Sequence, residues 1–241
     1  MFEFLIKIFD LALYQPLFNA LVLLYNYLPG HDFGIAIIVL TILIRFILYP
    51  ISVKAFKSQK ILQDLQPKLQ EIQKKYKDDK EKQAKETLEL YKKEKINPFS
   101  GLFLAIIQFP VLIALYRVFW KGLESSELVH LYAFIANPVN ISAVFIGLID
   151  LSKPNWIFAV LAGVLQYFQT KMMTPKRVKT ENKESEITQM MQTQMLYFFP
   201  FLTIIILISL PSAIGLYWIT SGIFSIIQQY FILKKTGIKT A

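Results

Sequence analysis

The sequence contains no cysteine and only two histidines, and these absences exclude several kinds of site. Without cysteine there is no disulfide framework, no thiolate metal site and no lipid-anchor cysteine. His31 and His130 lack the spacing of metal ligands, and we interpret both as surface residues of outer loops. The sequence therefore predicts neither a metal site nor a bound cofactor.

The motifs of nucleotide-driven and hydrolytic enzymes are also absent. No G-x-x-x-x-G-K-[ST] loop occurs, which argues against nucleotide-driven work by this chain. No G-x-S-x-G elbow occurs, and no lysine lies within the core of an apolar stretch to activate a serine. No such core contains a pair of carboxylates, as an aspartyl protease would need. We expect a protein without covalent catalysis or nucleotide hydrolysis.

What the sequence has in abundance is apolar surface. Its 241 residues are 54% hydrophobic and 15% aromatic, with a mean hydropathy of +0.44. This composition predicts an all-α polytopic membrane protein. Four long apolar stretches follow the N-terminal segment, and the last is about twice the ~20 residues of one crossing. Because Pro211 and Ser212 lie near its middle, we divide it into two spans joined by a tight turn, which gives five crossings.

The distribution of positive charge predicts the orientation. The net charge is +9, and 21 of the 26 lysines and arginines lie in the segments 52–97, 171–193 and 234–241. Short loops rich in lysine and arginine stay in the cytoplasm. We therefore expect a multi-pass membrane protein with the N-terminus outside and the C-terminus in the cytoplasm. The charge then needs no specific nucleic-acid binding to explain it.

These patterns divide the chain into ten segments. We predict an extracytoplasmic interfacial helix, five transmembrane helices (TM1 to TM5), a cytoplasmic helical hairpin, an outer loop, a cytoplasmic loop and a cytoplasmic tail. In chain order the boundaries are 1–32 for the interfacial helix, 33–51 for TM1, 52–97 for the hairpin, 98–120 for TM2, 121–154 for the outer loop, 155–173 for TM3, 174–193 for the cytoplasmic loop, 194–210 for TM4, 211–233 for TM5 and 234–241 for the tail.

The N-terminal segment has competing interpretations. Glu3 and Asp10 do not suit the basic start of a signal peptide, and no A-x-A-like cleavage site follows. A sixth span would be interrupted by polar residues and would break the charge bias. Glu3, Lys7, Asp10 and Tyr14 recur at helical spacing, which favours a helix lying in the outer membrane interface.

The polar segment 52–97 carries a heptad-like apolar seam, which predicts a charged helical hairpin with Pro67 tolerated at a kink. A weaker repeat follows the sequence KDDK. A recruitment platform and a plain link between two spans fit this spacing equally well. The seam residues are Leu62, Leu65, Leu69, Ile72, Tyr76, Leu88 and Tyr91.

Arg45 interrupts an apolar stretch that runs from Phe33 to Tyr49. A charge in the middle of a span costs about 2.5–3.5 kcal/mol on insertion scales. Either Arg45 snorkels to the inner headgroups, or it faces a water-accessible concavity. Polar residues on four predicted helices favour the concavity and a positively charged binding surface: Thr41, Gln108, Gln166, Gln169, Tyr217, Thr220, Ser221 and Gln228.

Six stretches carry a family resemblance over nearly the whole chain. They read IIVLTILIRFILYPIS, LQPKLQEIQKKYKDDKEK, LYKKEKINPFSGLFLAIIQFPVLIALYRV, LIDLSKPNW, VLAGVLQYFQTKM and LPSAIGLYWITSGIFSIIQQ. In this order they resemble the YidC/Oxa/Albino family of membrane-protein insertases, of the bacterial type without the large periplasmic domain. The resemblance implies a protein of the bacterial plasma (inner) membrane. The resemblance implies a hydrophilic groove among five helices. It implies that Arg45, Thr41 and Gln108 lie in the groove, and that Tyr217 and Trp218 contact the substrate.

The same resemblance implies a function and partners. Nascent membrane proteins would enter the positive groove and pass into the lipid bilayer, and the hairpin would recruit them. Further partners would be the Sec translocon, the signal recognition particle pathway and the ribosome, although the short tail makes strong ribosome docking doubtful. Two rival functions stay open at this point: a small-anion transporter that uses Arg45 as its ligand, and a membrane scaffold that acts through the hairpin.

Overall fold

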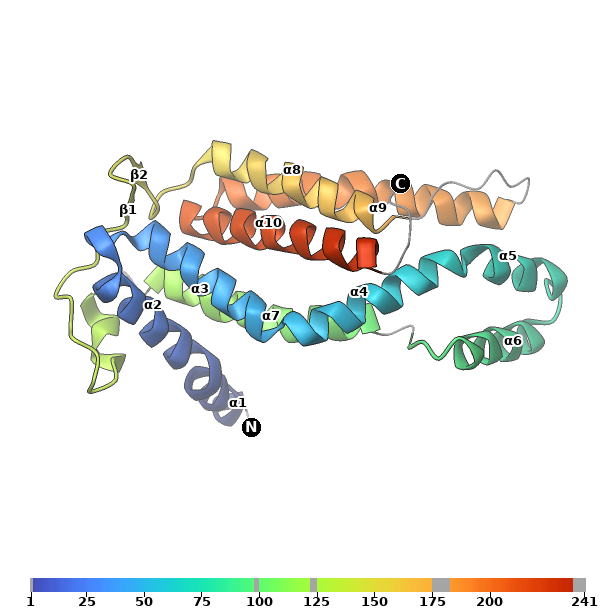
Figure 1. The fold of residues 1–241 in the computed structure, drawn as a ribbon, viewed down its shortest axis with the longest axis horizontal. Coiled ribbons are helices and arrows are strands. Elements are labelled where there is room, and N and C mark those ends of the chain that lie inside the picture. The colour runs from blue at the N-terminus through green and yellow to red at the C-terminus, as the bar shows by residue number, and fades with distance from the viewer. Residues whose placement is uncertain (1, 98–99, 122–124, 175–182, 236–241) are drawn as a thin grey trace.

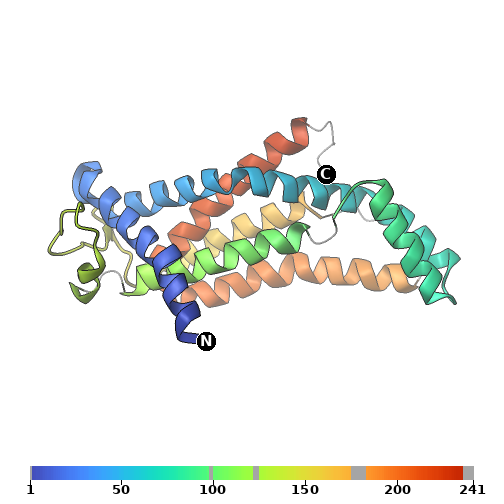
Figure 2. The same cartoon turned by 90° about the horizontal axis from the view of Figure 1, so that it is seen from below.

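The computed structural model describes residues 2–97, 100–121, 125–174 and 183–235, most of them helical. Its bundle consists of α3 (Phe33–Ile47), α7 (Ser100–Lys121), α8 (Trp156–Met172), α9 (Lys183–Ile208) and α10 (Ser212–Lys235). The central helix is α10, which packs against the other four. Figures 1 and 2 show these helices running along the long axis of the molecule, with loops at one end and a hairpin at the other. The all-α fold class is confirmed.

Local sequence signals begin and end several of these helices. The side chain of Asp32 caps α3 by accepting a hydrogen bond from the Ile35 amide at 2.9 Å, and Asn155 caps α8 through the Ile157 amide at 2.9 Å. The break between α9 and α10 falls at Pro211, as its position in the sequence suggests. The chain bends by 65° between α3 and α4 (Tyr49–Asp64). The segment predicted as TM1 thus includes α3 and the first turn of α4.

Two helices among the described residues are long and apolar enough to cross a membrane on their own, Ile6–Tyr27 and Ser212–Lys234. The bent pair α3 and α4 meets the same test together, and Ile106–Trp120 and Thr193–Ile208 are shorter apolar helices. Helix α9 begins at Lys183, inside the segment predicted as a cytoplasmic loop. Residues 175–182 of that loop and 236–241 of the tail lie outside the described residues. The number of five crossings stays a prediction.

The N-terminal segment is a helical rod that runs obliquely to the bundle helices, and its N-terminal end stands away from them (Figure 1). It consists of α1 (Phe2–Phe9), a π-helical turn at Asp10–Tyr14 and α2 (Gln15–Tyr27). Arg117 of α7 forms an ion pair with Asp10 and lies 4.4 Å from the ring centroid of Tyr14. Tyr14 donates a hydrogen bond to Glu127 of the outer loop. The rod is therefore docked on α7, while its predicted place in the membrane interface stays a prediction.

The outer loop holds the start of α10 in place. This loop contains a 3₁₀ helix at Ser125–His130 and a small antiparallel pair of strands, β1 (Val144–Phe145) and β2 (Ile149–Asp150). Just after β2, the carbonyls of Leu151 and Lys153 accept hydrogen bonds from the Ala213 and Ser212 amides at 3.1 and 2.9 Å. These bonds satisfy two of the amide groups that every helix leaves unpaired at its N-terminus. The LIDLSKPNW stretch thereby fixes the position of α10.

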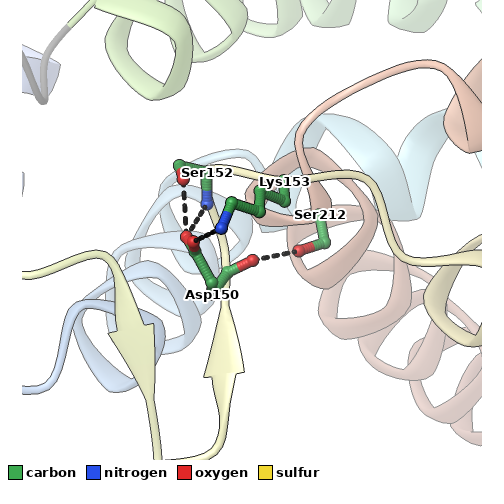
Figure 3. Close-up of polar contacts among 4 residues, drawn as sticks. All are labelled: Asp150, Ser152, Lys153 and Ser212. Carbon is green, nitrogen blue, oxygen red and sulfur yellow. Dashed lines mark hydrogen bonds and ion pairs between the residues drawn. The ribbon is translucent and has the colours of Figure 1, made fainter.

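Asp150 organises the turn that supplies these carbonyls (Figure 3). Its carboxylate accepts hydrogen bonds from the Ser152 hydroxyl at 2.5 Å and the Ser152 amide at 3.0 Å, and it pairs with Lys153 at 3.1 Å. These interactions lie within four consecutive residues and place the turn beside the first residue of α10, as the close-up shows.

At the opposite end of the molecule, α5 (Gln66–Lys75) and α6 (Lys80–Lys93) form a hairpin that continues from α4. Pro67 lies in the first turn of α5, where the chain breaks between α4 and α5. Leu65 and Leu69 are buried, and Leu62, Ile72, Tyr76 and Tyr91 are partly exposed. Leu88 is 57% exposed, so the second half of the predicted seam leaves an apolar side chain on the surface. The recruitment role of the hairpin stays a prediction.

Candidate functional site

A cavity of about 640 Å³ lies between the helices of the bundle, and we call it the central cavity. Its wall is built by α3, α4, α7, α8, α9 and α10. Several residues predicted to form a groove lie on this wall although they are far apart in the sequence. They are Arg45, Gln108, Gln166, Gln169, Tyr217, Trp218 and Ser221.

Arg45 is the only charged residue on the described part of this wall. Its guanidinium donates a hydrogen bond to the hydroxyl of Ser221, and its Nε is buried without a partner. None of the ion pairs among the described residues includes Arg45. A positive charge thus faces the cavity without a protein counter-ion.

Hydrogen bonds between neighbouring helices hold the polar wall in place. The Gln108 amide donates to the Tyr217 hydroxyl at 2.6 Å, which joins α7 to α10. The oxygen of Gln166 accepts from the Trp218 indole at 3.1 Å and from the Thr203 hydroxyl at 2.8 Å, which joins α8 to α10 and α9. Such bonds orient side chains across an interface between membrane helices. The aromatic pair Tyr217 and Trp218 is therefore fixed by partners on two other helices, α7 and α8.

Three residues predicted for the groove lie off the cavity wall. Thr41 is buried and donates its hydroxyl proton to the Ile37 carbonyl at 2.6 Å, while Thr220 does the same to Leu216 at 2.8 Å. Gln228 is buried and donates to the Ser52 hydroxyl at 2.8 Å, which links α10 to α4. In this structure these side chains stabilise helices and helix contacts. Their assignment to substrate binding stays a prediction.

The wall also contains polar residues that our sequence prediction missed, above all Gln59 of α4 and Gln229 of α10. The helical spacing of the sequence did contain a signal for Gln229. Tyr217, Ser221 and Gln229 are separated by four and eight residues, so they share one face of a helix. Gln59 lies within a segment whose lysines and glutamines gave no such pattern.

Comparison with known proteins identifies the family. The family described as 60Kd inner membrane protein matches residues 23–239. A membrane protein insertase YidC of Fusobacterium nucleatum is 36% identical over 205 residues, covering 85% of this chain and 87% of that protein. A YidC of Oceanobacillus iheyensis is 34% identical over 209 residues, covering 85% of this chain and 76% of that protein.

The chain belongs to the YidC insertase family.

Longer members and a solved structure agree with this assignment. The YidC of Syntrophus aciditrophicus is 38% identical over 223 residues, which are 92% of this chain but 36% of that protein. A crystal structure of an active YidC insertase with its first transmembrane domain resolved matches 90% of this chain and 46% of that chain, with a TM-score of 0.57 and 28% identity. The YidC fold therefore covers nearly all of the present sequence.

Proposed function

We propose that this chain is an insertase of the bacterial inner membrane that works without covalent catalysis or nucleotide hydrolysis. Its clients would be nascent membrane proteins, which enter the central cavity and leave it for the lipid bilayer. Family membership supports the insertase role, and the named relatives are insertases. The observation that carries the mechanism is the uncompensated charge of Arg45 on the cavity wall.

The charge of Arg45 gives the cavity a preference for acidic or polar segments. None of the five predicted spans contains an aspartate or glutamate, so the membrane part of the chain offers this arginine no internal counter-ion. Attraction between charges is stronger in a cavity of low dielectric than in water. We therefore infer that Arg45 draws in the polar flank of a client and shortens its path across the apolar layer.

Release into lipid would be driven by the client itself. Burial of apolar surface is favourable by about 25 cal/mol per Å², which for a whole span exceeds the cost of moving a short polar flank.

Two of the helices beside the cavity are short: the 15 residues of α3 and the 17 of α8 span about 22 and 25 Å. Both are shorter than the ~30 Å hydrocarbon layer. Tyr217 and Trp218 would guide the apolar segment outward.

The same proposal includes orientation and partners. The positive-inside bias supports an outer N-terminus and a cytoplasmic C-terminus. In that orientation the hairpin of α5 and α6 projects into the cytoplasm, where it would meet clients delivered by the signal recognition particle pathway, the ribosome or the Sec translocon. Thirteen lysines in 52–97 make this region strongly basic.

The test is insertion into liposomes that contain only the purified chain. The client is a single-span protein with a short acidic tail, and insertion is scored by protease protection of the tail. We expect protection above that of empty liposomes, reduced severalfold by Arg45→Ala and retained by Arg45→Lys. Protection that does not depend on Arg45 would contradict the role of the charge. Failure of the wild-type chain to protect the tail would favour a scaffold or a Sec-dependent chaperone.

A further inference from the structure

Gln229, in the C-terminal part of α10, is an anomaly on the wall of the central cavity. It lies on the cavity wall, yet its side chain is only 2% exposed. Its side-chain oxygen is buried and has no hydrogen-bond partner. A buried polar group without a partner costs about 1–3 kcal/mol. Such a group in a native protein calls for an explanation, for example a partner that is absent until a ligand binds.

Gln228, the adjacent residue on the same helix, does not carry this cost. Gln228 is equally buried, and its amide is paired with Ser52 at 2.8 Å. The terminal amide of a glutamine turns about a broad torsion, so the oxygen of Gln229 is free to change direction while the residue stays on the cavity wall. The structure therefore combines an unpaired acceptor with a cavity that its residue lines.

The cavity wall is rich in amides besides the charge of Arg45. Gln59, Gln108, Gln166, Gln169 and Gln229 come from α4, α7, α8 and α10. An amide both donates and accepts hydrogen bonds, so it pairs with a polypeptide backbone whatever the side chains are. Gln229 is eight residues from Ser221, the partner of Arg45, which is about 12 Å along the helix. About four residues of an extended chain cover that distance.

We propose that Gln229 is a client-binding residue whose side-chain oxygen accepts a hydrogen bond from a backbone N–H group of the client tail. This inference rests on the proposed insertase function. The contact holds an extended tail near the end of α10 while the leading part of the tail reaches Arg45. It would be independent of the tail's sequence, whereas the contact with Arg45 would depend on the tail's charge.

Gln229→Met tests the proposal, because methionine is close to glutamine in length and flexibility but has no comparable acceptor. The matched control is Ser225→Ala. Ser225 is one turn away on α10, fully buried, and its hydroxyl also lacks a partner, but it does not lie on the cavity wall. Both changes remove an unsatisfied polar group, so neither should lower the thermal unfolding midpoint.

We expect Gln229→Met to slow insertion about two- to tenfold, as for the loss of one neutral hydrogen bond, for acidic and neutral tails alike. Ser225→Ala should insert both clients at the wild-type rate. Unchanged insertion by Gln229→Met would overturn the proposal. So would a lowered unfolding midpoint in Gln229→Met and also in Gln229→Leu, because Gln229 would then have a structural role. Wild-type liposomes without insertion would instead refute the insertase function itself.

A second arm identifies the chemical group on the client. Ester bonds replace single backbone amides through the tail of a synthetic client, which removes one N–H donor at a time. At one or two positions the ester should slow insertion by the wild-type chain and have no further effect on Gln229→Met. If the ester effect is independent of Gln229 at every position, the proposed backbone contact does not exist.

Discussion

At the scale of single residues, Asp150 shows how local chemistry holds the turn beside α10. The hydrogen bond from the Ser152 side chain, followed by the interaction with Lys153, holds the pKa of the Asp150 carboxyl below its ordinary value of 3.8. Each partner favours the ionised form. The contribution of Asp150 to the stability of the turn is therefore fully present above the ordinary pKa and is lost as the pH falls through the lowered one.

This pKa is open to measurement by carbon-13 NMR, because the chain contains only six aspartates to label. We expect one carboxyl resonance to titrate below the ordinary value and to move back toward it in Ser152→Ala. Asp150→Asn should remove that resonance and identify it. A midpoint that stays the same in Ser152→Ala would show that Ser152 does not stabilise the carboxylate.

The polar residues of the cavity show at this scale what a sequence can and cannot predict. Arg45 and Gln108 were recognisable because each interrupts an apolar run. Their neighbours were harder to place, since helical spacing gives a shared face but not the direction in which that face points. Thr41 lies one turn from Arg45, yet its hydroxyl returns to the backbone of α3. Gln229 faces the cavity although Gln228 beside it does not.

At the scale of elements, Asn19 fastens the N-terminal rod to the outer loop. Its side chain is 1% exposed, donates to the His130 carbonyl at 3.1 Å and accepts from the Tyr132 amide at 2.7 Å. In the sequence Asn19 is one of the polar residues that interrupt the apolar N-terminal segment. The partners lie more than a hundred residues away, so only the folded chain explains why a polar group is there.

Asn19→Ala should therefore lower the free energy of unfolding by about 2 kcal/mol, because it removes a buried side chain that makes two part-buried hydrogen bonds to the outer loop. The measurement is denaturant or thermal unfolding in detergent micelles. Asn26→Ala is the control, since Asn26 is on the same helix and donates to the Ala136 carbonyl at 2.7 Å, but in an exposed contact. We expect its effect to be less than half as large. Equal losses of unfolding free energy in the two variants would indicate that burial of the asparagine does not decide how much stability its removal costs.

Helix boundaries also show, at the element scale, how far the sequence alone predicts the structure. The turn at Pro211 was predictable because proline has no amide proton and breaks a helix. The extension of α9 back to Lys183 was not, because residues 183–193 are polar and resemble a loop in composition. The apolar pattern marks where a helix meets lipid or core, and it does not mark where the helix ends in water.

At the scale of the whole molecule, charge and packing place constraints on how the chain sits in a membrane. The outer loop and the hairpin lie at opposite ends of the bundle (Figure 1). The basic segments lie toward the hairpin end in the predicted topology, which supports a cytoplasmic hairpin. The N-terminal rod is less constrained, because Ile6–Tyr27 is apolar and long enough to cross a membrane while its polar residues dock on α7 and the outer loop.

Single-cysteine variants decide the topology cleanly, because the chain has no cysteine of its own. Val139 in the outer loop is 79% exposed, Leu88 in the hairpin is 57% exposed, and Lys7 is an exposed residue of the N-terminal rod. In spheroplasts, a membrane-impermeant maleimide should label Val139→Cys and Lys7→Cys, and it should label Leu88→Cys only after permeabilisation. Labelling of Leu88→Cys in intact spheroplasts would reverse the proposed orientation. If Lys7→Cys also required permeabilisation, as Leu88→Cys does, while Val139→Cys did not, the rod would cross the membrane as a sixth span. The apolar length of Ile6–Tyr27 would then have overridden the positive-inside bias.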